Sequence, residues 1–177
     1  MFRYFFERRK ARTKAYELYS DLVNQARRPE FYTQYGVQDS IEGRFDMILL
    51  HLFLVDDRLS AEGDQFIPLR RYLQEAMVSD MDRSFREMGI GDMSVGKEMK
   101  KVGAAWLGRR AAYKAALEDG ASEDMLHDVL AKNLYDIESE APLLMMGTYV
   151  RHVKKLLSLT STLSVKDCKF VFPSPAE

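Results

Sequence analysis

One strongly apolar stretch constrains the fold of this chain more than any other feature. Residues 31–59 read FYTQYGVQDSIEGRFDMILLHLFLVDDRL, and the second half of this segment leaves almost no helical face polar. A helix that is apolar on every side is buried at the centre of a helical domain. We therefore expect this stretch to supply the central helix of the protein.

Three basic side chains interrupt that helix, and we refer to Arg44, His51 and Arg58 as the basic ladder. They are spaced by seven residues, and at about 100° per residue they lie within roughly 40° of one another. Buried charges need partners of opposite charge. Either carboxylates inside the fold pair with the ladder, or it stays open as a groove for a partner. Among the acids, we expect Asp80 to pair with Arg44, Arg58 or Arg109.

Helical signals mark most of the remaining chain. Apolar spacings of three and four residues, helix breakers and capping residues outline these further helices: 11–26, 64–88, 95–118, 123–137 and 142–159. Asp39 with Glu42 has the spacing of a capping box, Ser94 is placed to cap the helix at 95, and Ser122 precedes the helix at 123. KFVF, near the C-terminus, is too isolated to build a sheet.

These signals predict an all-α, single-domain bundle of about six helices with a short irregular C-terminal tail. We divide the chain into a basic N-terminal arm or helix at 1–28, a helical domain at 29–160 and a tail at 161–177. A length of 177 residues with 46% hydrophobic side chains is enough for one real core.

Composition excludes several classes of protein. The 26 basic and 27 acidic side chains balance, so no global field favours nucleic acid. One cysteine and three histidines exclude an intrachain disulfide and a Cys-rich metal site, and we expect no metal or other cofactor. The chain has no run of about 20 apolar residues and no secretory signal pattern, which favours a reducing cytoplasmic setting.

The glycine-rich segment GIGDMSVGKE resembles part of a phosphate-binding loop. Gly91 to Lys97 follow the pattern G-x-x-x-x-G-K, but Glu98 occupies the position that needs Ser or Thr, and no strand precedes it. We interpret the segment as a turn between two helices. No nucleophile elbow or helix-borne metal motif appears elsewhere, so we expect no enzymatic activity.

Two basic segments each allow two interpretations. Lys97, Lys100 and Lys101 share one helix face, which is either solvated or a contact for an acidic partner or ribosomal RNA. The N-terminal sequence MFRYFFERRKAR is either an arm that meets anionic lipid at a membrane interface or a helix packed on its own bundle.

Residues 31–117 resemble the ubiquinol–cytochrome c chaperone family. The stretches that carry the resemblance are GVQDSIEGRFDMILLHLFLVDDRL, DMDRSFREMGIGDMSVGKEMKK and WLGRRAAY. The family pattern runs through Gly36, Val37, Asp39, Gly43, Arg44, Phe45, His51, Arg58, Asp80, Arg86, Gly89, Gly91, Asp92, Lys97, Gly108, Arg109 and Tyr113.

Because members of this family are assembly factors of the cytochrome bc1 complex, the resemblance implies a non-catalytic chaperone of the respiratory chain, here a bacterial one. It implies cytochrome b or another bc1 subunit as partner, together with a small helical partner protein and the ribosome. A peripheral place at the cytoplasmic face of the inner membrane, with contact through residues 1–12, agrees with this role (mitochondrial in a eukaryote). We expect no DNA partner.

From the ladder and the resemblance we predict a partner-binding surface. Its residues are Tyr32, Asp39, Arg44, His51, Arg58, Asp80, Arg86, Asp92, Lys97, Lys101 and Arg109. The alternative function is an RNA- or ribosome-associated regulatory protein that uses Lys97, Lys100, Lys101 and Arg110. A small enzyme with a carboxylate-bound metal is a third reading, and no motif supports it.

Overall fold

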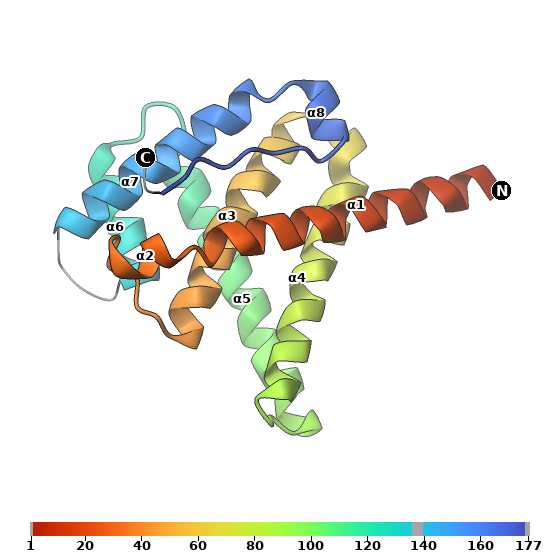
Figure 1. Ribbon diagram of the computed structural model, residues 1–177, viewed down its shortest axis with the longest axis horizontal. Helices are drawn as coiled ribbons and strands as arrows, with labels where there is room; N and C mark the ends of the chain where they lie inside the picture. Colours follow the sequence, from red (N-terminus) through yellow and green to blue (C-terminus); the bar gives the residue numbers. More distant parts are fainter. Residues whose placement is uncertain (1, 136–139, 176–177) are drawn as a thin grey trace.

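The computed structural model describes residues 2–135 and 140–175, and the side chains of residues 8–135 and 142–175. Every regular element in these ranges is a helix (Figure 1). The predicted all-α class is therefore confirmed. None of the described helices is both long enough and apolar enough to cross a membrane.

The helix α3, Ile41–Ala61, lies at the centre of the molecule as predicted. It contacts α1 (Phe2–Ala26), α4 (Ile67–Glu87), α5 (Asp92–Ala116) and α7 (Glu140–Leu159). Residues 47–56 of α3 are all buried. Burial of every face explains why this helix is apolar all round.

Shorter elements complete the chain. The structure adds α2 (Pro29–Thr33), the 3-10 turn η1 (Asp64–Phe66), α6 (Glu123–Leu130), the π-helical segment η2 (Ala131–Tyr135) and α8 (Thr162–Lys166). The sequence did not predict α2 or α8 because both are single turns of five residues, too short to show a period. Residues 123–135 form α6 and η2 within the helix predicted there, and 136–137 lie outside the described residues.

The predicted caps of α3 and α5 are wrong. Ser40, rather than Asp39, caps α3, because its Oγ accepts a hydrogen bond from the Gly43 amide at 3.0 Å. The Asp39 carboxylate instead meets Arg44 at 2.6 Å. Gly91 takes the N-cap position of α5 in place of Ser94. The helix α6 begins after Ser122 as predicted, and the Ser122 hydroxyl caps it by accepting a hydrogen bond from the Met125 amide.

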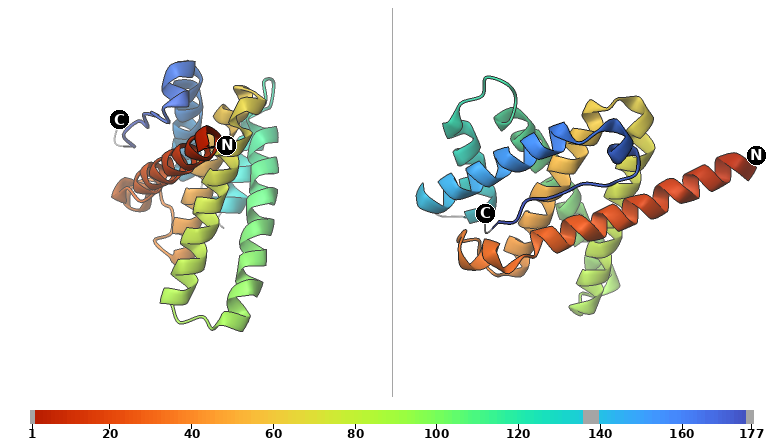
Figure 2. Two further views of the ribbon diagram at one scale, coloured as in Figure 1. Left: turned by 90° about the vertical axis from the view of Figure 1, so that its right-hand side faces the viewer. Right: turned by 45° about the horizontal axis from the view of Figure 1, so that its top comes forward.

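The glycine-rich segment is a turn between two helices, as interpreted from the sequence. Gly89 has φ +82°, a conformation that a residue with a side chain rarely adopts. The α5 helix begins at Asp92, so Gly96 and Lys97 are helical rather than part of a loop around a phosphate. This turn joins α4 and α5 into an antiparallel hairpin whose tip extends beyond the other helices (Figures 1 and 2).

The first helix both packs on the bundle and extends beyond it. Ala15, Leu18, Leu22 and Ala26 are buried in the common core, against α4 and α3. The N-terminal part of α1 runs outward past the rest of the molecule (Figure 1). The aromatic side chains at positions 2–6 lie outside the described side chains.

The C-terminal segment turns back across the bundle after α8 (Figure 1). Its KFVF sequence forms no strand, as predicted, and residues 169–174 are irregular. Phe172 packs edge-on against His51 at 5.8 Å between ring centroids. Tyr35 donates a hydrogen bond to the carbonyl of Pro175 at 2.9 Å. The tail is thus a docked part of the fold.

Candidate functional site

The middle residue of the basic ladder is sealed inside the protein. His51 is fully buried, and its Nδ1 lies 2.8 Å from the carbonyl of Met47. A carbonyl only accepts hydrogen bonds, so Nδ1 carries the proton and Nε2 accepts from the hydroxyl of Tyr149 at 2.8 Å. Burial lowers the pKa of His51 to about 4. His51 is therefore neutral and structural.

The last residue of the ladder binds the end of α7. Arg58 donates hydrogen bonds to the carbonyls of Leu157 at 2.7 Å and Thr160 at 2.9 Å. Its guanidinium also pairs with Glu62 at 2.5 Å, which lowers the pKa of that carboxyl. Cations are favourable at a helix C-terminus, so Arg58 is an intramolecular tie between α3 and α7.

Only the first residue of the ladder is open to solvent. Arg44 is exposed, pairs with Asp39, and lies with its Cζ 6.0 Å from the centre of the Tyr32 ring. The hydroxyl of Tyr32 donates to the carbonyl of Ala26 at 2.8 Å. The three residues Tyr32, Asp39 and Arg44 therefore form one surface cluster beside the start of α3.

The expected pairing of Asp80 is wrong. Asp80 lies on the side of α4 that faces α1, where it pairs with Arg83 at 2.5 Å and accepts a hydrogen bond from Tyr19 at 2.9 Å. It therefore ties α4 to α1, and Arg44, Arg58 and Arg109 have other partners.

Carboxylates on α3 itself pair with cations from α4 and α5. Asp56, only 1% exposed, meets Arg70 at 2.8 Å and Arg110 at 2.8 Å. Asp46 meets Arg109 at 2.7 Å. The RNA-binding alternative uses Arg110 as a contact, but in the structure Arg110 pairs with the buried carboxylate of Asp56. The sequence signal for both pairs was an acid within a helix that is otherwise apolar.

A groove lies between the start of α3 and the α4–α5 hairpin. Its volume is about 460 Å³. The lining residues, which define the client groove, are Arg27, Ile41, Glu42, Arg44, Phe45, Asp46, Ile48, Met81, Ser84, Phe85, Met88, Glu98, Lys101, Val102, Ala105 and Arg109. Apolar side chains from all three helices meet here, and charged residues surround them.

Two apolar residues of the client groove are notably open to water. Ile41 is 61% exposed and Met88 is 44% exposed, whereas Ile48, Met81 and Val102 are buried. Exposed apolar side chains beside an apolar hollow are typical of a surface that receives a partner.

One ion pair sits within the groove wall. Burial raises the pKa of Asp46 to about 6, against the opposing effect of Arg109. The Cζ of Arg109 lies 5.9 Å from the centre of the Phe45 ring, and its Nε is buried with no hydrogen-bond partner. A buried donor without an acceptor is costly, so this side chain is held in the groove wall at some cost in stability.

The structure brings together only part of the predicted surface. Arg44, Lys101 and Arg109 line the client groove, with Tyr32 and Asp39 in contact with Arg44. Arg86 contacts Asp82 and Asp92 at the hairpin tip, and Lys97 is exposed one turn later. His51, Arg58 and Asp80 lie outside the groove.

The sequence did not single out Ile41, Phe85 and Met88, which line the groove. Ile41 and Phe45 are four residues apart on α3, and Met81, Phe85 and Met88 are spaced by four and three on α4. This periodicity is the same as that of core residues. Only the projection of the hairpin beyond the bundle distinguishes residues that line the groove from residues of the core.

No described group of three or more His, Cys, Asp or Glu side chains is arranged to hold a metal ion. Two pairs of charged residues lie in the lining of the client groove, Lys101 with Glu98 at 2.8 Å and Arg109 with Asp46 at 2.7 Å. The groove is thus an apolar hollow with charged residues around it.

Comparison with known proteins identifies the family. The model of the ubiquinol-cytochrome C chaperone family matches residues 33–172. The chain belongs to the ubiquinol–cytochrome c chaperone family. The matched region extends beyond residues 31–117, which carried the resemblance in the sequence, through α6, α7 and α8.

A solved structure has the same fold. The crystal structure of the Cbp3 homolog from Brucella abortus superposes with a TM-score of 0.86 at 31% sequence identity, covering 100% of this chain and 99% of that chain. The family member's fold therefore extends over the whole chain, α1 included. Comparison with curated proteins gave no match.

Proposed function

We propose that this chain is a non-catalytic assembly chaperone of the ubiquinol–cytochrome c reductase (bc1) complex, and that it holds an apolar segment of newly made cytochrome b in the client groove. Family membership supports the chaperone role. The observation that carries the assignment of the site is the apolar hollow between α3 and the projecting α4–α5 hairpin, with Ile41 and Met88 open to solvent.

The shape of the groove suits a helical client. Its volume of about 460 Å³ has room for a few apolar side chains rather than for a whole helix. A client helix that lies across the opening would insert anchors at helical spacing, as in other helix-in-groove complexes. Methionine at positions 81 and 88 supplies flexible, polarizable contacts that adapt to different apolar side chains.

Release of the client follows from competition. The groove can cover only one side of a client helix, whereas several partner helices in an assembled complex can cover more of its surface. Later subunits therefore bind the client more tightly, and the equilibrium shifts from the chaperone-bound state to the assembled state. No nucleotide or catalytic step is needed.

Affinity purification of the tagged protein from its native cell, in mild detergent, tests the client. The wild type is expected to recover cytochrome b. The double variant Ile41→Asp/Met88→Asp places two carboxylates in the groove and is expected to lose cytochrome b. Both side chains are substantially exposed, so the variant should remain folded.

The matched control is Leu107→Asp/Met125→Asp. These apolar residues are also exposed, at 66% and 44%, but do not line the groove. Equal recovery of cytochrome b by the groove variant would contradict the assigned site. Absence of cytochrome b from the wild-type eluate would contradict the assigned client.

The remaining partners also belong to this proposal. Peripheral attachment to the inner membrane through residues 1–12 would keep the chaperone where cytochrome b is inserted. The outward course of α1 supports this part, because it leaves the basic N-terminal turns away from the core (Figure 1). A small helical partner protein and the ribosome are further partners that the family resemblance suggests.

A further inference from the structure

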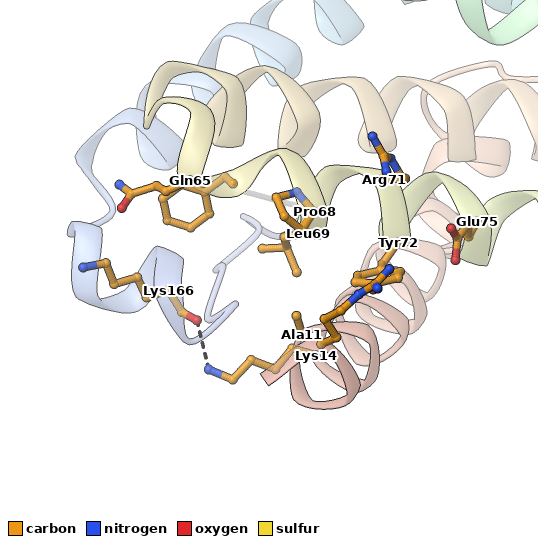
Figure 3. Close-up of a pocket in the computed structure, with 11 residues that line it drawn as sticks. Ala11, Lys14, Gln65, Pro68, Leu69, Arg71, Tyr72, Glu75 and Lys166 are labelled. Carbon is orange, nitrogen blue, oxygen red and sulfur yellow. Dashed lines mark hydrogen bonds between the residues drawn. The ribbon is translucent and has the colours of Figure 1, made fainter. Parts of the chain in front are cut away.

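A second hollow lies at the other end of the molecule, between α1, the start of α4 and α8 (Figure 3). Its volume is about 560 Å³, and none of its lining residues belongs to the client groove. We call it the basic pocket. From Leu69 at this end of α4 to Phe85 in the client groove, the rise of the helix corresponds to roughly 24 Å.

The inner part of the basic pocket is apolar. Phe66 and Leu69 are buried at its floor, and Ala11 and Pro68 complete the wall. Figure 3 shows Pro68 and Leu69 facing α1 across the hollow. An apolar floor of this kind accepts a hydrocarbon chain or a glycerol backbone rather than a fully polar ligand.

The outer part of the basic pocket is cationic. Arg8, Lys14, Arg71 and Lys166 line it, and Glu75 is the single carboxylate among the lining residues. In the described part of the chain, neither Arg71 nor Lys166 has a carboxylate within ion-pair distance, and both are exposed. Figure 3 shows the ammonium of Lys166 extending away from the hollow, so these two cations lie around its opening and not inside it.

The other two cations are held in position. Lys14 Nζ donates to the carbonyl of Lys166 at 2.9 Å and pairs with Asp167 at 2.8 Å, which ties α1 to α8. Arg8 Nε donates to the Tyr72 hydroxyl at 3.2 Å. The rim is thus preorganised by contacts between three segments that are distant in sequence.

More positive charge surrounds the pocket. The hydrogen bond and charge of Lys14 lower the pKa of Asp167, and Lys169 and Lys10 contribute in the same direction from further away. The exposed side chains of Arg9 and Lys10 continue this cationic surface along α1. One carboxylate beside Lys14 therefore does not neutralise the region.

Exposed apolar side chains flank the cationic rim. Leu163 is 72% exposed and precedes Lys166 by three residues on α8, so both lie on one side of that helix. Ile67, between the pocket residues Phe66 and Pro68, is 43% exposed. Basic residues combined with exposed apolar ones are the composition of a surface that rests at a membrane interface.

We propose that the basic pocket binds an anionic phospholipid at the membrane surface. Arg71 and Lys166 would meet the anionic headgroups around the opening of the pocket, and the floor at Phe66 and Leu69 would receive the glycerol and upper acyl region of one lipid. This assignment rests on the proposed peripheral association with the membrane and does not depend on the client groove. It implies that the N-terminal end of α4 faces the lipid, while the hairpin at the other end remains accessible to the client.

Vesicle flotation of the full-length protein tests this assignment. The probes are vesicles of phosphatidylcholine alone and of phosphatidylcholine mixed with phosphatidylglycerol. Wild type is expected to bind only the anionic vesicles. Arg71→Glu/Lys166→Glu is expected to bind them at least about tenfold more weakly, since each cation near an anionic surface contributes about 1 kcal/mol.

The matched control reverses two charges elsewhere. Lys114→Glu/Lys132→Glu changes the net charge by the same amount, and both lysines are exposed outside the basic pocket. The control variant is expected to lose much less affinity for anionic vesicles than the pocket variant. Thermal melts of both variants should overlay that of the wild type, because none of the four side chains has an ion-pair partner among the described residues.

A further pair of variants tests the apolar part. Leu163→Asp is expected to weaken vesicle binding, whereas Leu144→Asp, 59% exposed but on α7, is expected to leave it unchanged. Soluble glycerol phosphate should compete only weakly, because it lacks the acyl region. Full competition by glycerol phosphate would overturn the lipid assignment in favour of a small soluble phosphate ester.

The outcomes separate lipid binding by the basic pocket from peripheral association with the membrane. If wild type binds anionic vesicles and the pocket and control variants bind them equally well, the lipid site in the basic pocket is contradicted, whereas peripheral association stands. If wild type binds no vesicles, peripheral association fails together with the pocket. Recovery of cytochrome b by the client groove is measured in detergent and is unaffected by either result.

Discussion

The hydroxyl of Tyr149 donates a hydrogen bond to Nε2 of His51 at 2.8 Å, in a site closed to water. The same hydroxyl accepts from Gln25 at 3.0 Å, and Gln25 also donates to the carbonyl of Pro173 at 2.8 Å. This chain of bonds joins α1, α3, α7 and the C-terminal tail. Each polar group in it has a partner, which is the condition under which a buried polar network stabilises a fold.

Stability should fall in mild acid because of His51. The unfolded chain binds a proton at this residue near pH 6.5, whereas burial lowers the pKa in the folded protein to about 4. Between these values the unfolded state holds more protons, so the free energy of unfolding decreases as the pH falls. The loss from this residue reaches about 3 kcal/mol at the lower limit.

Urea unfolding at several pH values checks this expectation. His51→Gln should be less stable than wild type at pH 7, and its stability should depend less on pH between pH 6.5 and 4. His152→Gln, at an exposed position, is the control and should retain the wild-type slope. The same slope in the His51 variant and the wild type would show that His51 is not the titrating group.

Removal of the Asp56 carboxylate should be strongly destabilising. Asp56 is 1% exposed and bridges Arg70 and Arg110, so Asp56→Asn leaves two cations without their partner. The expected cost is about 3 kcal/mol of unfolding free energy. Asp57→Asn, at the neighbouring partly exposed position, should cost less than about 1 kcal/mol. Similar urea midpoints for the two variants would argue against a structural role of this cluster.

Gly43 should not tolerate a side chain. A Cβ at this position would lie 2.1 Å from the carbonyl oxygen of Gln38, within the turn that leads into α3. Gly43→Ala should therefore destabilise the protein by about 1–3 kcal/mol and disturb the groove edge at Ile41 and Arg44.

Gly103→Ala is the matched control for that substitution. Gly103 is also helical, and a Cβ there meets nothing within 4 Å. This change should raise stability by about 0.5–1 kcal/mol, since alanine favours a helix over glycine. Thermal unfolding of the two variants should therefore shift in opposite directions. A stable Gly43→Ala variant would mean that the turn has more freedom than the structure shows.

The central place of α3 could be predicted from its sequence, because a helix that is apolar on every side can only be buried. The seven-residue spacing of Arg44, His51 and Arg58 gave no sign of their partners. Backbone carbonyls of α7 bind Arg58, and a tyrosine 98 residues away binds His51. Neither carbonyls nor such distant contacts leave a signal in a single sequence.

The client groove was only partly predictable. Arg44, Lys101 and Arg109 were among the predicted binding residues, and they line it. Its apolar residues could not be told from core residues in the sequence, because apolar side chains have the same spacing toward a core and toward a groove. Met81 belongs to both, since it is buried in the core and also lines the groove. The groove depends on how the α4–α5 hairpin lies against α3, which is a property of the whole fold.

Site-specific photocrosslinking in the native cell tests most directly whether the groove holds the client. A photoreactive residue is placed at Ile41 or Met88 within the groove, and at Leu107 outside it. Crosslinks to cytochrome b from both groove positions, and none from Leu107, are the expected result. Crosslinks to cytochrome b from Leu107 alone, or equally from all three positions, would contradict the assignment of the groove as the client site.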